Sequence, residues 1–81
     1  MYLHIGKDYI VKSNEIIGIF NVDYVKNTKE YKSMYNALEE SGNLIKVSDS
    51  KAKACILTEN QGKRKAYITN IGVNTISKRM I

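Results

Sequence analysis

The chain has 81 residues, with no proline, one cysteine, 43% apolar residues and a formal net charge of +5. This length predicts one domain, 1–81, at the small end of what folds alone. No segment has the roughly 18 consecutive apolar residues of a membrane helix, and the N-terminal stretch lacks a signal-peptide pattern. The single Cys55 excludes an intramolecular disulfide. We therefore expect a cytoplasmic protein without a membrane partner, stabilised by packing.

The positive charge is concentrated in the second half of the chain. Residues 1–45 carry five lysines and six acidic residues, a net charge of −1, whereas residues 46–81 carry eight Lys or Arg and two acidic residues, a net charge of +6. This asymmetry favours an anionic partner, because lysine and arginine neutralise the phosphates of nucleic acids. The alternative is that a small cytosolic protein is mildly basic without a functional reason.

The N-terminal part of the chain predicts three strands. Residues 2–5 and 9–12 flank the turn Gly6-Lys7-Asp8, and residues 15–22 follow. The third segment is apolar on both of its alternating faces, so both faces should be covered. The long helix provides one cover, and a second copy of the chain is a candidate for the other. The expected partner is therefore the chain itself, as a homo-oligomer.

The only long helix is predicted over residues 28–41. Asn27 or Thr28 can cap it, and Glu30, three residues after Asn27, suits a capping box. Gly42 provides the left-handed stop. An apolar stripe at helical spacing marks the buried face, and it consists of Tyr31, Met34, Tyr35 and Leu38.

The second half of the chain predicts three further strands and a short helix. The strands cover residues 44–47, 54–58 and 65–69, and Gly62 lies in the turn between the last two. Residues 74–79 form one or two helical turns. The order β-β-β-α-β-β-β-α predicts an α+β fold with a small antiparallel sheet of five or six strands.

No catalytic or metal-binding constellation is evident in the sequence. His4 and Cys55 are the only residues of their kind, whereas a zinc site needs about four convergent ligands. Cys55 lies in an apolar segment, which favours a buried, inert thiol over a nucleophile. Glu39 and Glu40 are adjacent on a helix and point in different directions, so they do not form a catalytic pair. We expect no enzyme activity, no cofactor and no small-molecule substrate.

The basic residues are the remaining candidates for function. Lys51 and Lys53 differ by two positions, so they share one face if the backbone there is extended. The other candidates are Lys63, Arg64, Lys65, Lys78 and Arg79. Together these residues predict contacts with the phosphates of duplex DNA. The alternative is that hairpin tips and chain ends are simply solvated, and that edge lysines prevent aggregation.

Two other modes of nucleic-acid binding are disfavoured. The polar face of the long helix carries Lys29 and Lys32 but also Glu39 and Glu40, which does not suit insertion into a major groove. The tyrosines that are candidates for stacking on single-stranded bases lack the spacing of a stacking platform. They are Tyr9, Tyr24 and Tyr67.

The sequence resembles the RemA/RemB family of extracellular matrix regulators, and it is most similar to the RemB type. The segments that carry the resemblance are Met1-Tyr2-Leu3-His4-Ile5-Gly6, Tyr9-Ile10-Val11, Glu15-Ile16-Ile17-Gly18-Ile19-Phe20, Glu40-Ser41-Gly42-Asn43-Leu44-Ile45, Lys46-Val47-Ser48, Lys65-Ala66-Tyr67-Ile68 and Thr75-Ile76-Ser77-Lys78-Arg79. The resemblance covers nearly the full length and is weakest at 21–38. It implies a regulator of matrix and biofilm genes, and the RemA branch of the family binds DNA and assembles into ring-shaped homo-oligomers.

The resemblance also bears on individual residues. The RemA branch has a run of arginines, among them DNA contacts, before a strand, and Ser50-Lys51-Ala52-Lys53 matches it here. Lys51 and Lys53 keep the basic character without the planar fork of arginine. Another RemA arginine is matched by Glu15, which reverses the charge. The first hypothesis is thus a DNA-binding transcriptional regulator, and the second, favoured by Glu15, is an oligomeric adaptor that binds a protein partner.

Overall fold

Six strands and three α-helices follow one another along residues 1–80, the part of the chain that this computed structural model describes. The elements are β1 (Tyr2–Gly6), β2 (Tyr9–Lys12), the 3-10 turn η1 (Ser13–Glu15), β3 (Ile16–Asn21), α1 (Val22–Val25), α2 (Lys29–Glu40), β4 (Leu44–Lys46), β5 (Ala54–Asn60), β6 (Lys63–Thr69) and α3 (Val73–Arg79). The predicted α+β class is confirmed. The short helix α1 differs from the prediction, which assigns residues 15–22 to one continuous strand.

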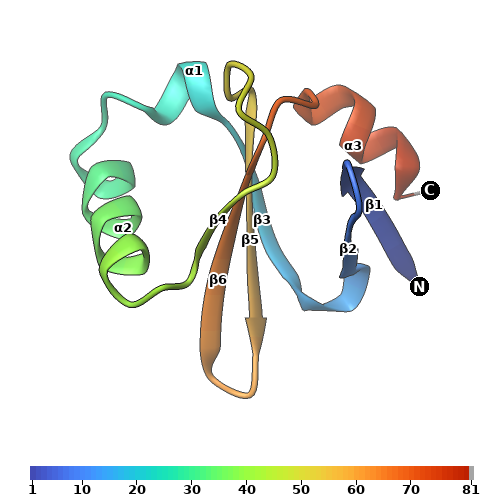
Figure 1. Cartoon of the computed structure of the whole chain (residues 1–81), viewed down its shortest axis with the longest axis horizontal. Helices are drawn as coiled ribbons and strands as arrows, with labels where there is room; N and C mark the ends of the chain where they lie inside the picture. The colour runs from blue at the N-terminus through green and yellow to red at the C-terminus, as the bar shows by residue number, and fades with distance from the viewer. Residues whose placement is uncertain (81) are drawn as a thin grey trace.

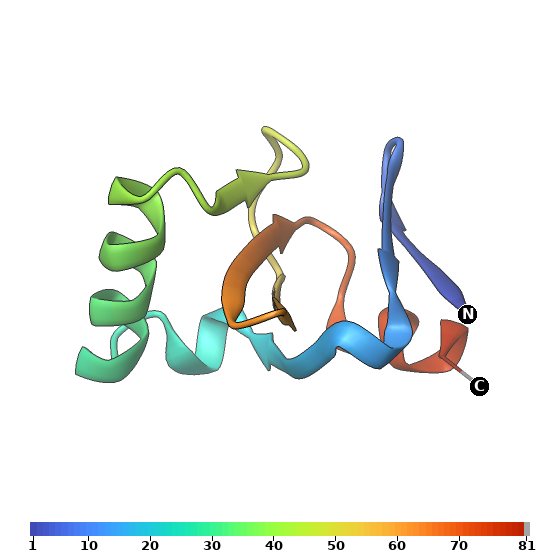
Figure 2. The same cartoon turned by 90° about the horizontal axis from the view of Figure 1, so that it is seen from below.

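The molecule has three layers, with a four-stranded sheet of order β3-β5-β6-β4 in the middle (Figure 1). Helix α2 covers one face of this sheet, and the two-stranded ribbon β1-β2 lies with α3 on the other side, an arrangement that Figure 2 shows from below. The prediction of a single antiparallel sheet is wrong on two points. Strands β1 and β2 form a sheet of their own, and β4 pairs with β6 in parallel.

Each side of the central sheet has its own core. On the ribbon side, Leu3, Ile5 and Val11 pack with Ile56 and Ile76. On the side of α2, the stripe Tyr31, Met34, Tyr35 and Leu38 packs against a buried cluster, as predicted; this cluster consists of Val22, Cys55, Leu57, Ala66 and Ile68. The buried strand β5 contributes to both cores, because its successive side chains point to opposite faces.

Helix α2 begins after Thr28, whose hydroxyl accepts a hydrogen bond from the backbone N–H of Tyr31 at 3.2 Å. Thr28 is therefore the cap, and the residue three positions later is Tyr31. The predicted capping box between Asn27 and Glu30 is not formed, since Glu30 is only two positions beyond the cap. The helix ends at Glu40, and Gly42 has the predicted left-handed conformation, with φ of +77°.

Strand β3 is an edge strand with apolar side chains that the rest of the chain covers only in part. Ile16 and Ile19 pack against the ribbon-side core, whereas Ile17 is 51% exposed and Phe20 is 37% exposed. A register shift between Ile16 and Gly18 interrupts the simple alternation of faces. The expectation that both faces of this segment are covered is thus not met within one chain.

The β5–β6 hairpin is closed by a two-residue turn, Gln61-Gly62, which is shorter than the predicted connection. Both residues have positive φ angles, +52° and +80°, as a type I′ turn requires. The strands consequently extend to Asn60 and from Lys63, and these two residues are paired. This pairing decides where the basic residues of β6 lie.

Thr69 joins the ribbon to the central sheet. Its side chain is 1% exposed, its hydroxyl donates to the Ile5 carbonyl at 2.8 Å, and the same oxygen accepts from the Ile71 N–H at 3.2 Å. Valine has nearly the same shape but neither donates nor accepts, so Thr69→Val leaves both backbone groups without this partner. We expect the free energy of unfolding to fall by about 2 kcal/mol in urea denaturation. An unchanged midpoint would contradict this role.

Candidate nucleic-acid interface

The loop before β5 places Lys51 and Lys53 on one side of the chain. Ala52, between them, packs against the α2-side core, so its two neighbours point the opposite way. The backbone of Lys53 is fixed on both sides, because its N–H donates to the Thr69 carbonyl at 2.8 Å and its carbonyl accepts from the Val22 N–H at 3.0 Å. The shared face expected from their spacing is present, although β5 itself begins only at Ala54.

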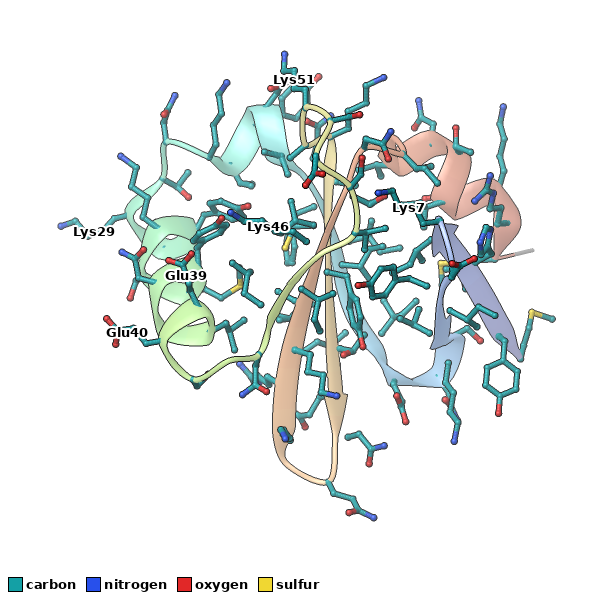
Figure 3. The ribbon with its side chains drawn as sticks, viewed as in Figure 1. Lys7, Lys29, Glu39, Glu40, Lys46 and Lys51 are labelled. Atoms are coloured by element: carbon teal, nitrogen blue, oxygen red, sulfur yellow. The ribbon has the colours of Figure 1, made fainter. Side chains whose placement is uncertain are left out.

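These two lysines line an open cleft, here called the lysine cleft. Its lining residues come from three segments of the chain and are Asn21, Asp23, Lys51, Lys53, Gly72, Val73 and Asn74. Figure 3 shows Lys51 at the top of the molecule, beside α1 and at the end of the sheet opposite to the β5–β6 turn. The cleft therefore combines two ammonium groups with two asparagine side chains, which can donate hydrogen bonds to phosphates or base edges.

The size of the lysine cleft does not suit a typical small-molecule site. Its volume is about 250 Å³, below the roughly 300–1,000 Å³ that such sites usually have. Lys51 and Lys53 are both exposed rather than enclosed. An open cleft with exposed lysines is better suited to groups projecting from a large anionic surface, such as backbone phosphates.

Acidic residues reduce the net positive charge at the end of the molecule that carries the lysine cleft. Asp23 lines the cleft but forms a 3.5 Å ion pair with Lys26, and Asp49 lies in the loop that carries Lys51. Lys26, Lys51 and Lys53 against Asp23 and Asp49 leave a net charge of +1 from these five residues. This end of a single chain thus offers few unopposed positive charges to DNA.

The basic residues of the β5–β6 hairpin lie at the opposite end of the sheet. The seven residues of β5 separate them from the lysine cleft by roughly 20 Å. Lys63 and Lys65 share one depression with Asn60 and Gln61. Arg64 lies on the other face, beside α2, where its Nε donates to Glu59 at 2.9 Å. The predicted triplet therefore does not form one patch.

The last two predicted basic residues end helix α3. Arg79 donates to the His4 carbonyl at 2.9 Å and so fastens α3 to β1. Lys78 is exposed. Within one chain the seven predicted residues consequently form separate groups. Lys51 and Lys53 are the one pair among them that shares a cleft with polar side chains from distant segments.

Glu15, which stands where the RemA branch has an arginine, lies far from the lysine cleft. Its carboxylate accepts a hydrogen bond from the Asn60 side chain at 2.7 Å, at the end of the sheet that carries the β5–β6 turn. The length of β3 separates Glu15 from Asn21 in the cleft. Glu15 therefore does not oppose Lys51 or Lys53 within the chain.

Cys55 is a free cysteine whose side chain is buried, as expected. Burial raises the pKa of its thiol to about 11, so the thiol is neutral at pH 7. We expect a thiol reagent such as DTNB to react slowly with the native protein and rapidly after denaturation. Complete reaction of the native protein within seconds would contradict the burial of this side chain.

The free energy of unfolding should fall at alkaline pH, because burial favours the neutral forms of the Tyr31 and Cys55 side chains. Burial raises the pKa of Tyr31 to about 12, and the nearby Cys55 contributes in the same direction. The folded state holds the protons of these two side chains more tightly than the unfolded state does. The stabilisation that results is complete at neutral pH and is lost as the pH rises above about 9.

His4 lies apart from any cluster of acidic residues in the described range, 1–80. The ring of His4 is hydrogen-bonded to the Lys7 carbonyl on the ribbon. Within residues 1–80, no three His, Cys, Asp or Glu side chains are grouped so that they can hold a metal ion. None of the helices in this range has the length and apolar character needed to cross a bilayer.

Several residues of the lysine cleft are absent from the sequence-based prediction. Asn21 precedes α1, where its side chain accepts from the Asp23 N–H at 3.0 Å, and Asn74 lies in the first turn of α3. The pair Asn21 and Asp23 is a local signal for a helix start. Nothing local indicates that Asn74 meets Lys51, because the tertiary fold brings them together.

These features define the chain as a small three-layer α+β domain with a polar, lysine-containing cleft at one end of its sheet. The family model of extracellular matrix regulatory protein A-like (RemA-like) proteins matches residues 2–80. The chain belongs to this family, and the family implies a regulator of the extracellular matrix of biofilms. No curated protein matched the sequence.

Proposed function

We propose that this matrix regulator is a DNA-binding transcriptional regulator, in which several copies of the chain together contact the phosphates of one duplex. The observation that carries the proposal is the lysine cleft, where Lys51 and Lys53 project on the same side of an anchored loop. Hydrogen-bonding side chains of Asn21 and Asn74 lie beside them. Such a combination of point charges and neutral donors suits a phosphate backbone.

Several copies are needed for DNA binding because the end of the chain that carries the lysine cleft has a low net charge. The five charged residues at this end sum to +1, so this end of one chain attracts DNA only weakly. When identical subunits are joined, each further contact becomes intramolecular and the affinities reinforce one another. The proposal therefore combines a weak site with a homo-oligomer.

The edge strand β3 supports self-association. It contains neither a charged residue nor a proline, the usual protections of an edge strand against further pairing. Exposed Ile17 and Phe20 lie on it. Next to it, a mostly apolar cleft opens between β3, α1 and α2, lined by Phe20, Val25, Thr28, Glu30, Tyr31 and Met34.

A second apolar surface lies on the opposite side of the molecule, on the outer face of the ribbon. Tyr2 is 69% exposed and Ile10 is 58% exposed there. Figure 1 shows the ribbon and α2 on opposite sides of the central sheet. Because the two surfaces differ, contact between them is head-to-tail, and a head-to-tail contact closes into a ring when the rotation between subunits permits.

The test is a fluorescence anisotropy titration of a labelled duplex at increasing salt concentration. We expect binding at low salt, and a linear fall of log K with log of the salt concentration, with a slope of about −0.9 for each neutralised phosphate. Absence of binding at low salt, or binding that salt does not affect, would rule out the proposal. A chain that assembles without binding DNA would instead support the adaptor function.

A further inference from the structure

We propose that Tyr24 is a further DNA contact beside the lysine cleft, where its ring packs against the sugars and base edges of the duplex. This inference rests on the proposed DNA-binding function. It adds a contact of a different kind, because an aromatic ring contributes affinity without neutralising a phosphate. The affinity that it contributes should therefore not weaken with salt.

The single turn of α1 determines where Tyr24 points. Successive residues of an α-helix are rotated by about 100°, so the four side chains of Val22–Val25 leave the helix in four directions. Val22 is buried at 8% exposure, and Tyr24 is about 200° from it. Tyr24 therefore points away from the core. Asp23 on one flank lines the lysine cleft, and Val25 on the other lines the apolar cleft.

The position of α1 is fixed relative to the loop that carries the lysines. The Val22 N–H donates to the Lys53 carbonyl at 3.0 Å, and the Lys26 N–H closes the turn on the Val22 carbonyl at 2.8 Å. Asn21 caps the start of α1. The backbone of Tyr24 is therefore held close to Lys53 by two short segments, and Figures 1 and 3 show α1 and the Lys51 loop at the same end of the molecule.

The exposure of Tyr24 is exceptional within the described chain. Its side chain is 83% exposed, the highest value among the exposed large hydrophobic residues. The other tyrosines with a possible stacking role lie elsewhere. Tyr67 packs against the ribbon-side core, and Tyr9 is on the ribbon. Among the tyrosines of residues 1–80, only Tyr24 combines this high exposure with a place beside the lysines, so a duplex seated on Lys51 and Lys53 would meet its ring.

The experiment measures duplex affinity by anisotropy over a series of salt concentrations for the wild-type chain, Tyr24→Ala, Tyr24→Phe and Lys51→Ala. We expect Tyr24→Ala to bind about tenfold more weakly at every salt concentration, with the wild-type slope. Tyr24→Phe retains the ring and should bind within about twofold of the wild type. Lys51→Ala should instead reduce the magnitude of the slope by about 0.9 for each phosphate that is no longer neutralised.

Three results would overturn the role of Tyr24. Wild-type affinity in Tyr24→Ala would show that the ring does not touch the duplex. Equal weakening in Tyr24→Phe and Tyr24→Ala would assign the effect to the hydroxyl. A changed mass of the Tyr24→Ala assembly in light scattering would assign Tyr24 to a subunit interface. In each case wild-type binding, and so the proposed function, would stand, whereas a wild-type chain that does not bind DNA would overturn both.

Discussion

The double substitution Lys51→Glu/Lys53→Glu should weaken binding of duplex DNA at least about 100-fold at low salt. The change removes two positive charges and adds two negative ones in the lysine cleft of every subunit of the proposed assembly. Both side chains are exposed, so the free energy of unfolding should change by less than about 0.5 kcal/mol per position. Anisotropy measures the binding, and circular dichroism during urea denaturation measures the stability.

The matched control is Lys29→Glu/Lys32→Glu, which makes the same charge change on the exposed face of α2. We expect this control to bind DNA several-fold more weakly at most, because only the long-range field changes. A third variant, Lys63→Glu/Lys65→Glu, makes the change at the other end of the sheet. Equal weakening in all three variants would show that binding depends on net charge alone, and the cleft would then have no special part.

The substitution Ile17→Lys should dissociate the assembly. Ile17 is 51% exposed on the unprotected edge strand β3, so a lysine is tolerated in the free subunit but places a charge in the proposed apolar interface. Light scattering should show a mass close to the 9.2 kDa of one subunit. DNA affinity should fall about 100-fold, because the contacts of separate subunits no longer reinforce one another.

Asn36→Lys is the control for this experiment, since it adds the same charge at an exposed position on α2. It should leave both the mass and the affinity close to those of the wild type. An unchanged mass for Ile17→Lys would show that β3 is not in the interface. Dissociation of the assembly with unchanged DNA affinity would show that one subunit suffices for binding.

Local patterns predicted those parts of the fold that depend on neighbouring residues. The spacing of Tyr31, Met34, Tyr35 and Leu38 fixes the buried face of α2, and Gly62 marks the β5–β6 turn. The pairing of strands was harder to predict from the sequence, because it depends on contacts between distant segments. The parallel pairing of β4 with β6 and the separation of the ribbon follow from packing across the whole chain.

In the candidate site, too, features set by neighbouring residues were predicted and features set by tertiary contacts were not. Lys51 and Lys53 share a face because an extended backbone alternates its side chains, a property that spacing alone conveys. The same alternation separates Arg64 from Lys63 and Lys65, once the turn at Gln61-Gly62 defines the start of β6. The contribution of α3 to the cleft is a tertiary contact that no local pattern encodes.

The most direct test of a regulator that binds DNA as an assembly is the mass of the wild-type protein by light scattering, with and without a duplex, at low and high salt. Without DNA we expect the same multiple of 9.2 kDa at both salt concentrations, because apolar contacts hold the subunits together. With DNA, low salt should give the mass of the assembly plus the duplex, and high salt should release the duplex from an intact assembly. A mass of one subunit under all conditions, or an assembly whose mass DNA does not change at low salt, would contradict the account.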